Sequence, residues 1–427
     1  MRQFLYIETM DKEQLKRVVL DQKNYFSNRN NLIDRDINYD IYIRTAQIVV
    51  ISGVRRCGKS CLLSLFRQKM NLTEKQYCYL NCDDERLQLN ESLLDQLYSL
   101  HLEMYGTEPV FFFDEVQAVP KWEKFVNRMY ELGHKVFVTG SNAHLLSSEI
   151  ATSLTGRNRV ITLFPFSFKE YLRYKGHQYH LEALTTMEKS RLLADLNAYQ
   201  RTGGFPLVVQ EEDMEILNAW FQDILYRDVV SRYRLSQVKE LRQMAIYLFS
   251  NVGKPFSYST LQKVSELKSL SSVSDYLQYL EQSYLFFYLP KFDYSVKKQM
   301  LNSKKLYVID AGAINRLGFH FSEEKGRLLE NTVFLELLRR GKEVYYYRGE
   351  KECDFVIVEN GKVVEAIQVT DKINEQDKDR EVGGLKEAIN TFHLENAKII
   401  VYDRDDCLTD GVDVPLVSVW EWLIIGS

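Results

Sequence analysis

The chain has 427 residues, of which 45% are hydrophobic and 27% charged, and its formal net charge is −4. This length exceeds what one hydrophobic core usually organises, so we expect two or three domains of ordinary globular composition. No apolar run approaches the roughly 20 residues that span a bilayer, the N-terminal residues lack the apolar stretch of a secretory signal, and the six cysteines include no Cys-x-x-Cys pair. These features exclude a membrane, disulfide-rich or zinc-ribbon protein and predict a cytoplasmic one.

The N-terminal third predicts an α/β domain. Residues 1–45 are expected to form a helix followed by an Asn-rich connector. From 46 to 170, short apolar runs such as "QIVVIS", "QYCYLN", "PVFFFDE" and "KVFVTGS" alternate with amphipathic stretches. Apolar runs of this length between helical patterns are typical of a parallel sheet with crossover helices.

The octapeptide "GVRRCGKS" fits the phosphate-binding pattern G-x-x-x-x-G-K-[ST]. Gly53 and Gly58 allow a turn tight enough for backbone N–H groups to surround phosphates. Lys59 is expected to reach the β- and γ-oxygens, and the Ser60 hydroxyl to bind Mg²⁺. The helix that follows points its positive end at the same anion. The predicted nucleotide-binding residues are Gly53, Val54, Arg55, Arg56, Cys57, Gly58, Lys59, Ser60 and Cys61.

Acidic and polar residues follow the next strands. Asp114, at the end of "VFFFD", is placed to hold Mg²⁺, and Glu115 to act as general base on the attacking water. Ser141 and Asn142 follow "KVFVTG" and are alternative positions for sensing the γ-phosphate. Arg157 is a candidate for stabilising transition-state charge in its own or a neighbouring subunit, the alternative being an ordinary surface arginine. The pattern predicts ATP and Mg²⁺ as cofactors and allows a homo-oligomer.

Residues 171–235 predict a helical extension that includes a break at "TGGFP". Residues 236–310 predict three helices and two strands, the pattern of a winged helix whose third helix can enter the major groove of DNA. Residues 227–310 hold thirteen Lys/Arg against seven Asp/Glu, a local balance of +6. DNA is therefore one predicted partner, and protein docking or a purely structural role is the alternative. The presumed wing carries the candidate phosphate contacts Lys297, Lys298, Lys304 and Lys305.

Residues 311–427 predict a last α/β segment, with strands near 343–347, 353–358, 362–370 and 398–402. Taken with the motifs above, "FPFSFKEYL", "GGFP", "KLYVIDAG", "LLENTVFLEL", "ECDFVIV" and "IQVT" resemble one family over about residues 45–405. It is the family of bacterial and archaeal AAA+-type P-loop ATPases that carry a C-terminal conserved domain of PD-(D/E)XK nuclease-like fold. The resemblance implies the nucleotide, Mg²⁺ and hydrolysis roles given above.

The nuclease-like segment departs from the chemistry that its resemblance implies. Such a site needs an acid on a helix, a second acid on a strand, and Glu-x-Lys on the next strand, to hold a metal and activate water. Glu330 and Asp354 match the two acids, but Gln368 and Thr370 stand in place of Glu and Lys. Glu365 cannot compensate, because side chains alternate along a strand and it faces the other way. Lys372 lies where the strand is expected to end.

The sequence therefore predicts an α/β chain with a P-loop NTPase sheet domain, a helical extension, a winged helix and a catalytically degenerate nuclease-like domain. We expect it to hydrolyse ATP and to use the cycle to change how its C-terminal half engages a partner. Two alternatives are an ATP-gated, metal-dependent nuclease and a nucleotide-switched protein-binding scaffold with slow turnover.

Overall fold

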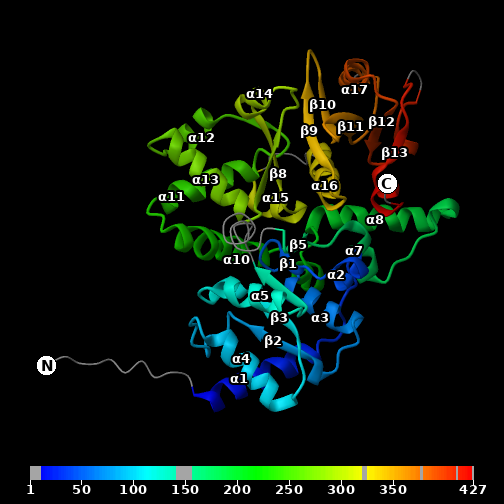
Figure 1. Ribbon diagram of the computed structural model, residues 1–427. Coiled ribbons are helices and arrows are strands. Elements are labelled where there is room, and N and C mark those ends of the chain that lie inside the picture. Colours follow the sequence, from blue (N-terminus) through cyan, green and yellow to red (C-terminus); the bar gives the residue numbers. More distant parts are fainter. Residues whose placement is uncertain (1–10, 141–155, 320–324, 376–377, 410–411, 426–427) are drawn as a thin grey trace. The chain divides into compact units, whose positions relative to one another are not determined.

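The computed structural model describes residues 11–140, 156–319, 325–375, 378–409 and 412–425. The chain divides into two compact units, Met1–Leu163 and Phe164–Ser427 (Figure 1). Across the described ranges, no helix combines the length and apolar character that crossing a bilayer requires.

The first unit is built on a parallel sheet in the order β2-β3-β4-β1-β5. Its strands are β1 (Ile48–Ser52), β2 (Tyr77–Asn81), β3 (Val110–Asp114), β4 (Val136–Gly140) and β5 (Asn158–Thr162). Its described helices are α1 (Lys12–Ser27), α2 (Tyr39–Arg44), α3 (Lys59–Lys69), α4 (Leu93–Tyr105) and α5 (Trp122–Glu131), with short turns η1 (Glu74–Gln76) and η2 (Val116–Ala118). The predicted parallel sheet is confirmed.

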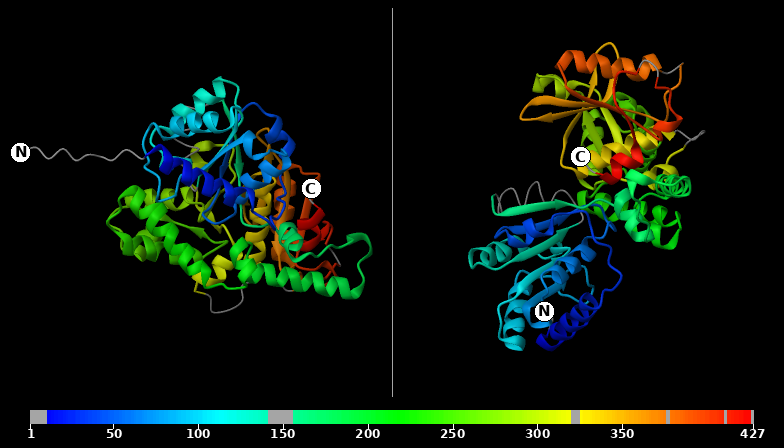
Figure 2. Two further views of the ribbon diagram at one scale, coloured as in Figure 1. Left: turned by 90° about the horizontal axis from the view of Figure 1, so that it is seen from below. Right: turned by 90° about the vertical axis from the view of Figure 1, so that its right-hand side faces the viewer.

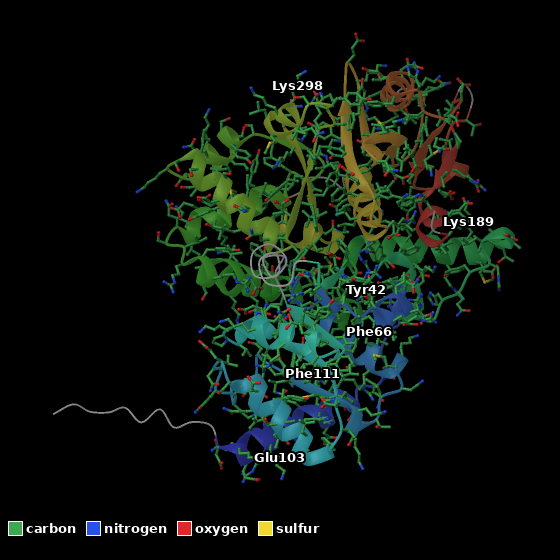
Figure 3. All side chains as sticks on the ribbon, in the orientation of Figure 1. Tyr42, Phe66, Glu103, Phe111, Lys189 and Lys298 are labelled. Atoms are coloured by element: carbon green, nitrogen blue, oxygen red, sulfur yellow. The ribbon has the colours of Figure 1, made fainter. Side chains whose placement is uncertain are left out.

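Aromatic side chains fill both faces of this sheet, and Figure 2 shows helices on either side of it. On one face Phe112 stacks on Phe137 at 5.0 Å between ring centroids, and Phe66 of α3 lies 4.7 Å from Phe137. On the other face Phe111 meets Phe125 of α5 edge-on at 5.7 Å; Phe66 and Phe111 are labelled in Figure 3. Alternate residues of β3 thus enter opposite cores, which fixes the strand that carries the acids.

Helix α1, from the segment expected to precede the domain, is part of the first unit's core. Leu15 and Val18 are buried in the cluster that includes the sheet residues, and Phe26 stacks on Tyr79 of β2 with centroids 4.0 Å apart.

The second unit begins with α7 (Phe168–Lys175), η4 (Leu181–Ala183), α8 (Thr186–Thr202), α9 (Pro206–Glu211), α10 (Ile216–Asp223) and the π-helical η5 (Ile224–Ser231). Next come α11 (Val238–Phe249), β6 (Pro255–Phe256), α12 (Tyr258–Ser265), α13 (Leu270–Gln282), β7 (Phe286–Pro290), α14 (Val296–Leu301), β8 (Lys304–Val308) and α15 (Ala311–Leu317). The three strands form an antiparallel sheet in the order β6-β8-β7. Helix α14 lies between β7 and β8, in the stretch expected to form the wing.

The remainder of the second unit is a mixed α/β sheet in the order β13-β12-β11-β10-β9, antiparallel from β9 to β11 and parallel from β11 to β13. Its elements are α16 (Lys325–Arg339), β9 (Glu343–Arg348), β10 (Glu352–Glu359), β11 (Lys362–Thr370), α17 (Lys378–Phe392), β12 (Asn396–Val401), η6 (Arg404–Asp406), β13 (Leu416–Ser418) and α18 (Val419–Ile425). The four strands expected from the sequence coincide with β9 to β12.

Two of the sequence motifs, "GGFP" and "VIDAG", meet in a buried structural joint of the second unit. Asp310 accepts hydrogen bonds from the backbone N–H of Gly204 at 2.7 Å and of Ala313 at 3.2 Å, capping α15. A Cβ on Gly203 would lie 1.9 Å from the Asp310 carboxylate, so only glycine fits there. Burial raises the pKa of Asp310 to about 6. These glycines serve packing, and no ligand is needed to explain them.

Candidate nucleotide-binding site

The phosphate loop leaves the carboxyl end of β1, between β4 and β5 in the sheet. Gly53 has φ +155°, and a Cβ there would lie 2.1 Å from the carbonyl oxygen of Leu163, so the close backbone approach requires glycine. Gly58 has φ +104°, and α3 begins at the next residue. The free N–H groups of the first turn of α3 therefore border the loop.

Lys59 is folded into this loop. Its side chain is buried, and its Nζ donates to the carbonyl oxygens of Gly53 at 3.1 Å and Val54 at 3.2 Å. The same nitrogen lies 3.7 Å from Oε1 of Glu115. A phosphate oxygen is a stronger partner for an ammonium than a carbonyl, because both groups are charged. The lysine is thus held next to the place that an anion would take.

Asp114 is the last residue of β3, Glu115 follows it, and one hydroxyl joins the two acids. Thr139 Oγ1, at the end of neighbouring β4, donates to Oδ1 of Asp114 and accepts from the backbone N–H of Glu115 at 2.9 Å. Burial, and next the charge of Glu115, raises the pKa of Asp114, while hydrogen bonds from Ser60 and Thr139 oppose the rise. The backbone of Glu115 is left-handed, with φ +51°, and its Oε2 accepts from Gln117 at 2.6 Å. The acids are thereby fixed in place.

The other predicted loop residues contribute mainly backbone. Val54 and Cys57 are fully buried, and Arg56 has φ +67°. Burial raises the pKa of the Cys57 and Cys61 thiols, so both stay protonated at neutral pH. A reactive thiolate at the loop is therefore not expected.

Sequence reasoning missed two residues at this site. Thr139 lies two residues before Ser141 and three before Asn142, the predicted sensors, which are outside the described residues. Arg35, in the expected connector, is buried and donates through Nη1 to the carbonyl oxygen of Cys57 at 3.1 Å. A polar residue at the end of β4 was a usable signal for Thr139, whereas a lone arginine far upstream of the loop gave none.

Arg157 lies at the opposite edge of the sheet from the loop. Its carbonyl oxygen accepts from the N–H of Ile48, the first residue of β1, at 2.9 Å. Its guanidinium contacts Asn127 and lies 3.1 Å from Oε1 of Glu131. The five residues of β1, at about 3.3 Å each, put roughly 16 Å between this edge and the loop. The structure therefore does not bring Arg157 to the loop of its own unit.

In the second unit, the two predicted acids Glu330 and Asp354 are brought together, with an unexpected partner. Lys305 Nζ lies 3.0 Å from Glu330 Oε1 and 2.9 Å from Asp354 Oδ1. The expectation that Lys305 contacts phosphates from an exposed wing is wrong, because its side chain is almost wholly buried. A charged lysine with acidic neighbours is drawn inward where the carboxylates offset its desolvation.

The remaining predicted positions lie around this pair. Gln368 Nε2 donates to Glu381 at 2.9 Å, and its Oε1 accepts from the backbone N–H of Asp354 at 3.3 Å. Thr370 donates to the carbonyl oxygen of Lys372 at 3.3 Å. The side chain of Glu365 pairs with that of Lys398, at 2.7 Å. Among the described residues, no cluster of three or more His, Cys, Asp or Glu is arranged to hold a metal ion.

A parallel sheet with this loop and this acidic strand end defines an AAA-type P-loop nucleotide-binding domain, and comparison with known proteins agrees. The family model of an AAA domain matches residues 45–172. Two models of domains of unknown function, DUF8612 and DUF4143, match residues 193–324 and 325–422.

Two relatives match nearly the whole chain. It is 38% identical over 429 residues to the uncharacterized protein MJ1544 of Methanocaldococcus jannaschii, covering 95% of this chain and 94% of that protein. It is 30% identical over 433 residues to an uncharacterized protein of Haemophilus influenzae, covering 96% and 100%. The chain belongs to the same family as these two proteins.

The solved structures matched by this chain are more distant. The Holliday junction branch migration motor RuvB of Thermotoga maritima is 13% identical, with a TM-score of 0.28 over 65% of this chain and 88% of that one. The replication initiator DnaA bound to AMPPCP and single-stranded DNA is 15% identical, with a TM-score of 0.24 over 65% and 90%. TM-scores this low do not establish a shared overall fold.

An AAA domain implies ATP and Mg²⁺ in general, and the residues at this site fit both. The loop supplies backbone N–H donors and an ammonium for phosphates, and Ser60 with Asp114 offers the hydroxyl and carboxylate oxygens that Mg²⁺ favours.

Proposed function

We propose that this chain is an ATPase that binds MgATP at the loop Gly53–Ser60 and hydrolyses the γ-phosphate. The observation that carries the proposal is the convergence of three charged side chains at one sheet edge. Lys59 lies 3.7 Å from Glu115, and Thr139 bonds both Glu115 and Asp114. The reaction needs three groups: an ammonium that binds phosphate, a carboxylate that binds the metal and a carboxylate that activates water.

The roles of the side chains follow from their positions. Lys59 exchanges its two carbonyl partners for phosphate oxygens, and Ser60 and Asp114 would hold Mg²⁺, which neutralises phosphate charge. Glu115, one-fifth exposed and oriented by Gln117, accepts the proton of the attacking water.

We infer that Arg157 contributes to hydrolysis at the site of a neighbouring subunit. Its distance from the loop of its own unit supports this assignment. A working enzyme is then a homo-oligomer with a shared site.

The second unit is proposed to engage a partner according to nucleotide state. The order α11, β6, α12, α13, β7, β8, with the sheet order β6-β8-β7, supports a winged helix. Lys298 lies on α14 at the periphery of the unit, with 70% of its side chain exposed (Figure 3). The exposed lysine on α14 supports DNA as the partner, and protein docking is the other outcome of a binding test. The mixed C-terminal sheet is proposed to be nuclease-like in fold.

Two substitutions in the loop and the acidic pair test the ATPase proposal. Lys59→Ala is expected to abolish nucleotide binding, whereas Glu115→Gln keeps binding and stops turnover. Loss of a general base lowers the rate by about 10²–10⁴-fold. The measurements are binding of a fluorescent ATP analogue and release of phosphate, with and without DNA.

The outcomes separate the alternatives. Full hydrolysis by the Glu115→Gln protein would remove that residue from the mechanism. Wild-type protein that binds ATP and associates with its partner, yet releases almost no phosphate, would instead indicate the nucleotide-switched scaffold.

A further inference from the structure

A buried ammonium in the second unit is surrounded by three carboxylates. Lys305, at the start of β8, places its Nζ 2.8 Å from Glu352 Oε1, 2.9 Å from Asp354 Oδ1 and 3.0 Å from Glu330 Oε1. The lysine side chain is 2% exposed, and those of Asp354, Glu330 and Glu352 are 10%, 11% and 32% exposed. Two elements, α16 and β10, thus bring carboxylates to a nitrogen carried by β8.

This cation bonds to the two acids predicted from the sequence. Its Nζ donates hydrogen bonds to Glu330 at 3.0 Å and to Asp354 at 2.9 Å, and it forms an ion pair with Glu352 at 2.8 Å. Further hydrogen bonds also fix the positions of the two acids. Tyr307 donates to Oε1 of Glu330 at 2.6 Å, and the backbone N–H of Val369 donates to Oδ2 of Asp354 at 3.1 Å. The cluster is an ordered network, and the charge on the lysine is favoured by its neighbours despite burial.

The same oxygens that a divalent metal would use are bonded to this nitrogen. A metal such as Mg²⁺ requires oxygen ligands at about 2.0–2.1 Å and usually keeps several waters. Nζ occupies the position between Glu330 Oε1 and Asp354 Oδ1 where a metal ion would bind. Neither the ion nor its waters therefore fit while the lysine is in place. We propose that Lys305 is the resident cation of this carboxylate site and takes the place of a divalent metal.

The lysine and its acids come from different sequence segments. Lys305 lies in the segment matched by one domain model, residues 193–324, whereas Glu330, Glu352 and Asp354 lie in the segment matched by the other, residues 325–422. The cation therefore cross-links two segments of one compact unit. Removing one partner of a buried ion pair leaves an uncompensated charge, so the cross-link is needed for stability once the acids are present.

The test counts Mn²⁺ ions bound to the full, nucleotide-free chain, because Mn²⁺ favours the same ligands as Mg²⁺ and is detected directly by electron paramagnetic resonance. Wild type and Asp354→Asn are expected to bind the same number of ions. Lys305→Ala frees the carboxylates and makes room for waters, so it is expected to bind one further Mn²⁺. Its melting temperature is expected to be lower than that of wild type and to increase when Mn²⁺ is added. The gain is lost in Lys305→Ala/Asp354→Asn. Lys304→Ala, next in sequence, is the matched control and binds as wild type.

Two results would overturn the proposal. One is an ion on the wild-type protein that Asp354→Asn removes, and the other is a folded Lys305→Ala protein that binds no further Mn²⁺. If Lys305→Ala does not fold, Lys305→Met/Glu330→Gln keeps the stem volume and the net charge of the cluster. This double variant is expected to have a higher melting temperature than Lys305→Met alone. Equal melting temperatures would contradict a charged cross-link.

Nuclease assays give an independent readout. Wild type with Mg²⁺ or Mn²⁺, with and without ATP, is expected to leave supercoiled, linear and single-stranded DNA intact. Cleavage that disappears in Asp354→Ala but survives Lys59→Ala would show a working metal centre and refute the proposal. None of these arms depends on ATP hydrolysis, so the proposal and the ATPase assignment fail separately.

Discussion

The hydroxyl of Thr139 provides the sharpest test of how the acidic pair is held. It donates to Asp114 Oδ1 and accepts from the backbone N–H of Glu115 at 2.9 Å, and Thr139 itself is fully buried. Thr139→Val replaces the hydroxyl by a methyl group of similar size. The substitution leaves the Glu115 N–H without this acceptor and Asp114 without this donor, while the packing of β4 changes little.

The size of the effect follows from these two bonds. A hydrogen bond to a charged group contributes about 1.5–3 kcal/mol. If that energy holds Asp114 ionised and Glu115 in place for the reaction, its loss corresponds to a decrease of about 10- to 150-fold in rate, at about 1.4 kcal/mol per decade. The pKa of Asp114, already raised by burial, rises further, so the Mg²⁺ requirement should also increase.

The assay is phosphate release at saturating ATP over a range of Mg²⁺ concentrations, with thermal unfolding to verify the fold. Thr139→Ser retains the hydroxyl and is expected to stay within a few-fold of wild type. A folded Thr139→Val protein with the wild-type rate and Mg²⁺ requirement would refute the role assigned to this hydroxyl.

Three further predictions concern the first unit. Arg157→Ala should lower the ATPase rate by about 10³–10⁵-fold, and the wild-type rate per subunit should rise steeply with protein concentration; a constant rate in a demonstrable monomer would exclude action in trans. Gly53→Ala should lower the melting temperature and abolish nucleotide binding, since its Cβ would meet the Leu163 carbonyl oxygen at 2.1 Å, and unchanged binding would contradict this packing. Burial lowers the pKa of His101 from 6.5 to about 4, so the stability it contributes is complete above pH 6.5 and is lost as the pH falls towards 4; denaturant titrations should show that slope in wild type but not in His101→Gln.

Local patterns were enough to predict the parallel sheet and the nucleotide loop. The loop is formed by consecutive residues. The spacing of Gly53 and Gly58 is therefore enough to predict the backbone conformation that the loop requires at both glycines. Asp114 is placed by the apolar strand that it ends, because that strand must be buried on both faces. For such features the chain neighbours determine the environment, so sequence reasoning succeeds.

Features made by distant residues could not be predicted in the same way. Arg35 reaches the loop from a connector with no periodicity, and its contact depends on where the preceding helix packs. Four lysines near a predicted hairpin suggest phosphate contacts, so the sequence pattern places Lys305 in an exposed wing. Its strand position instead turns it inward, as the neighbouring Lys304 turns away, and only the fold shows which of the two faces the acids.

The two acidic sites of this chain show why residue type alone does not decide chemistry. Each pairs two carboxylates with a lysine, Asp114 and Glu115 with Lys59, and Glu330 and Asp354 with Lys305. Lys59 bonds loop carbonyls and only approaches Glu115, at 3.7 Å, so its charge is available to an arriving phosphate. By contrast, Lys305 donates hydrogen bonds to both acids of its site, at 3.0 and 2.9 Å, and pairs with Glu352 at 2.8 Å, so its charge is already neutralised and a metal has no place to bind. The partners of the ammonium, more than the acids themselves, distinguish a site that can exchange ligands from one that is closed.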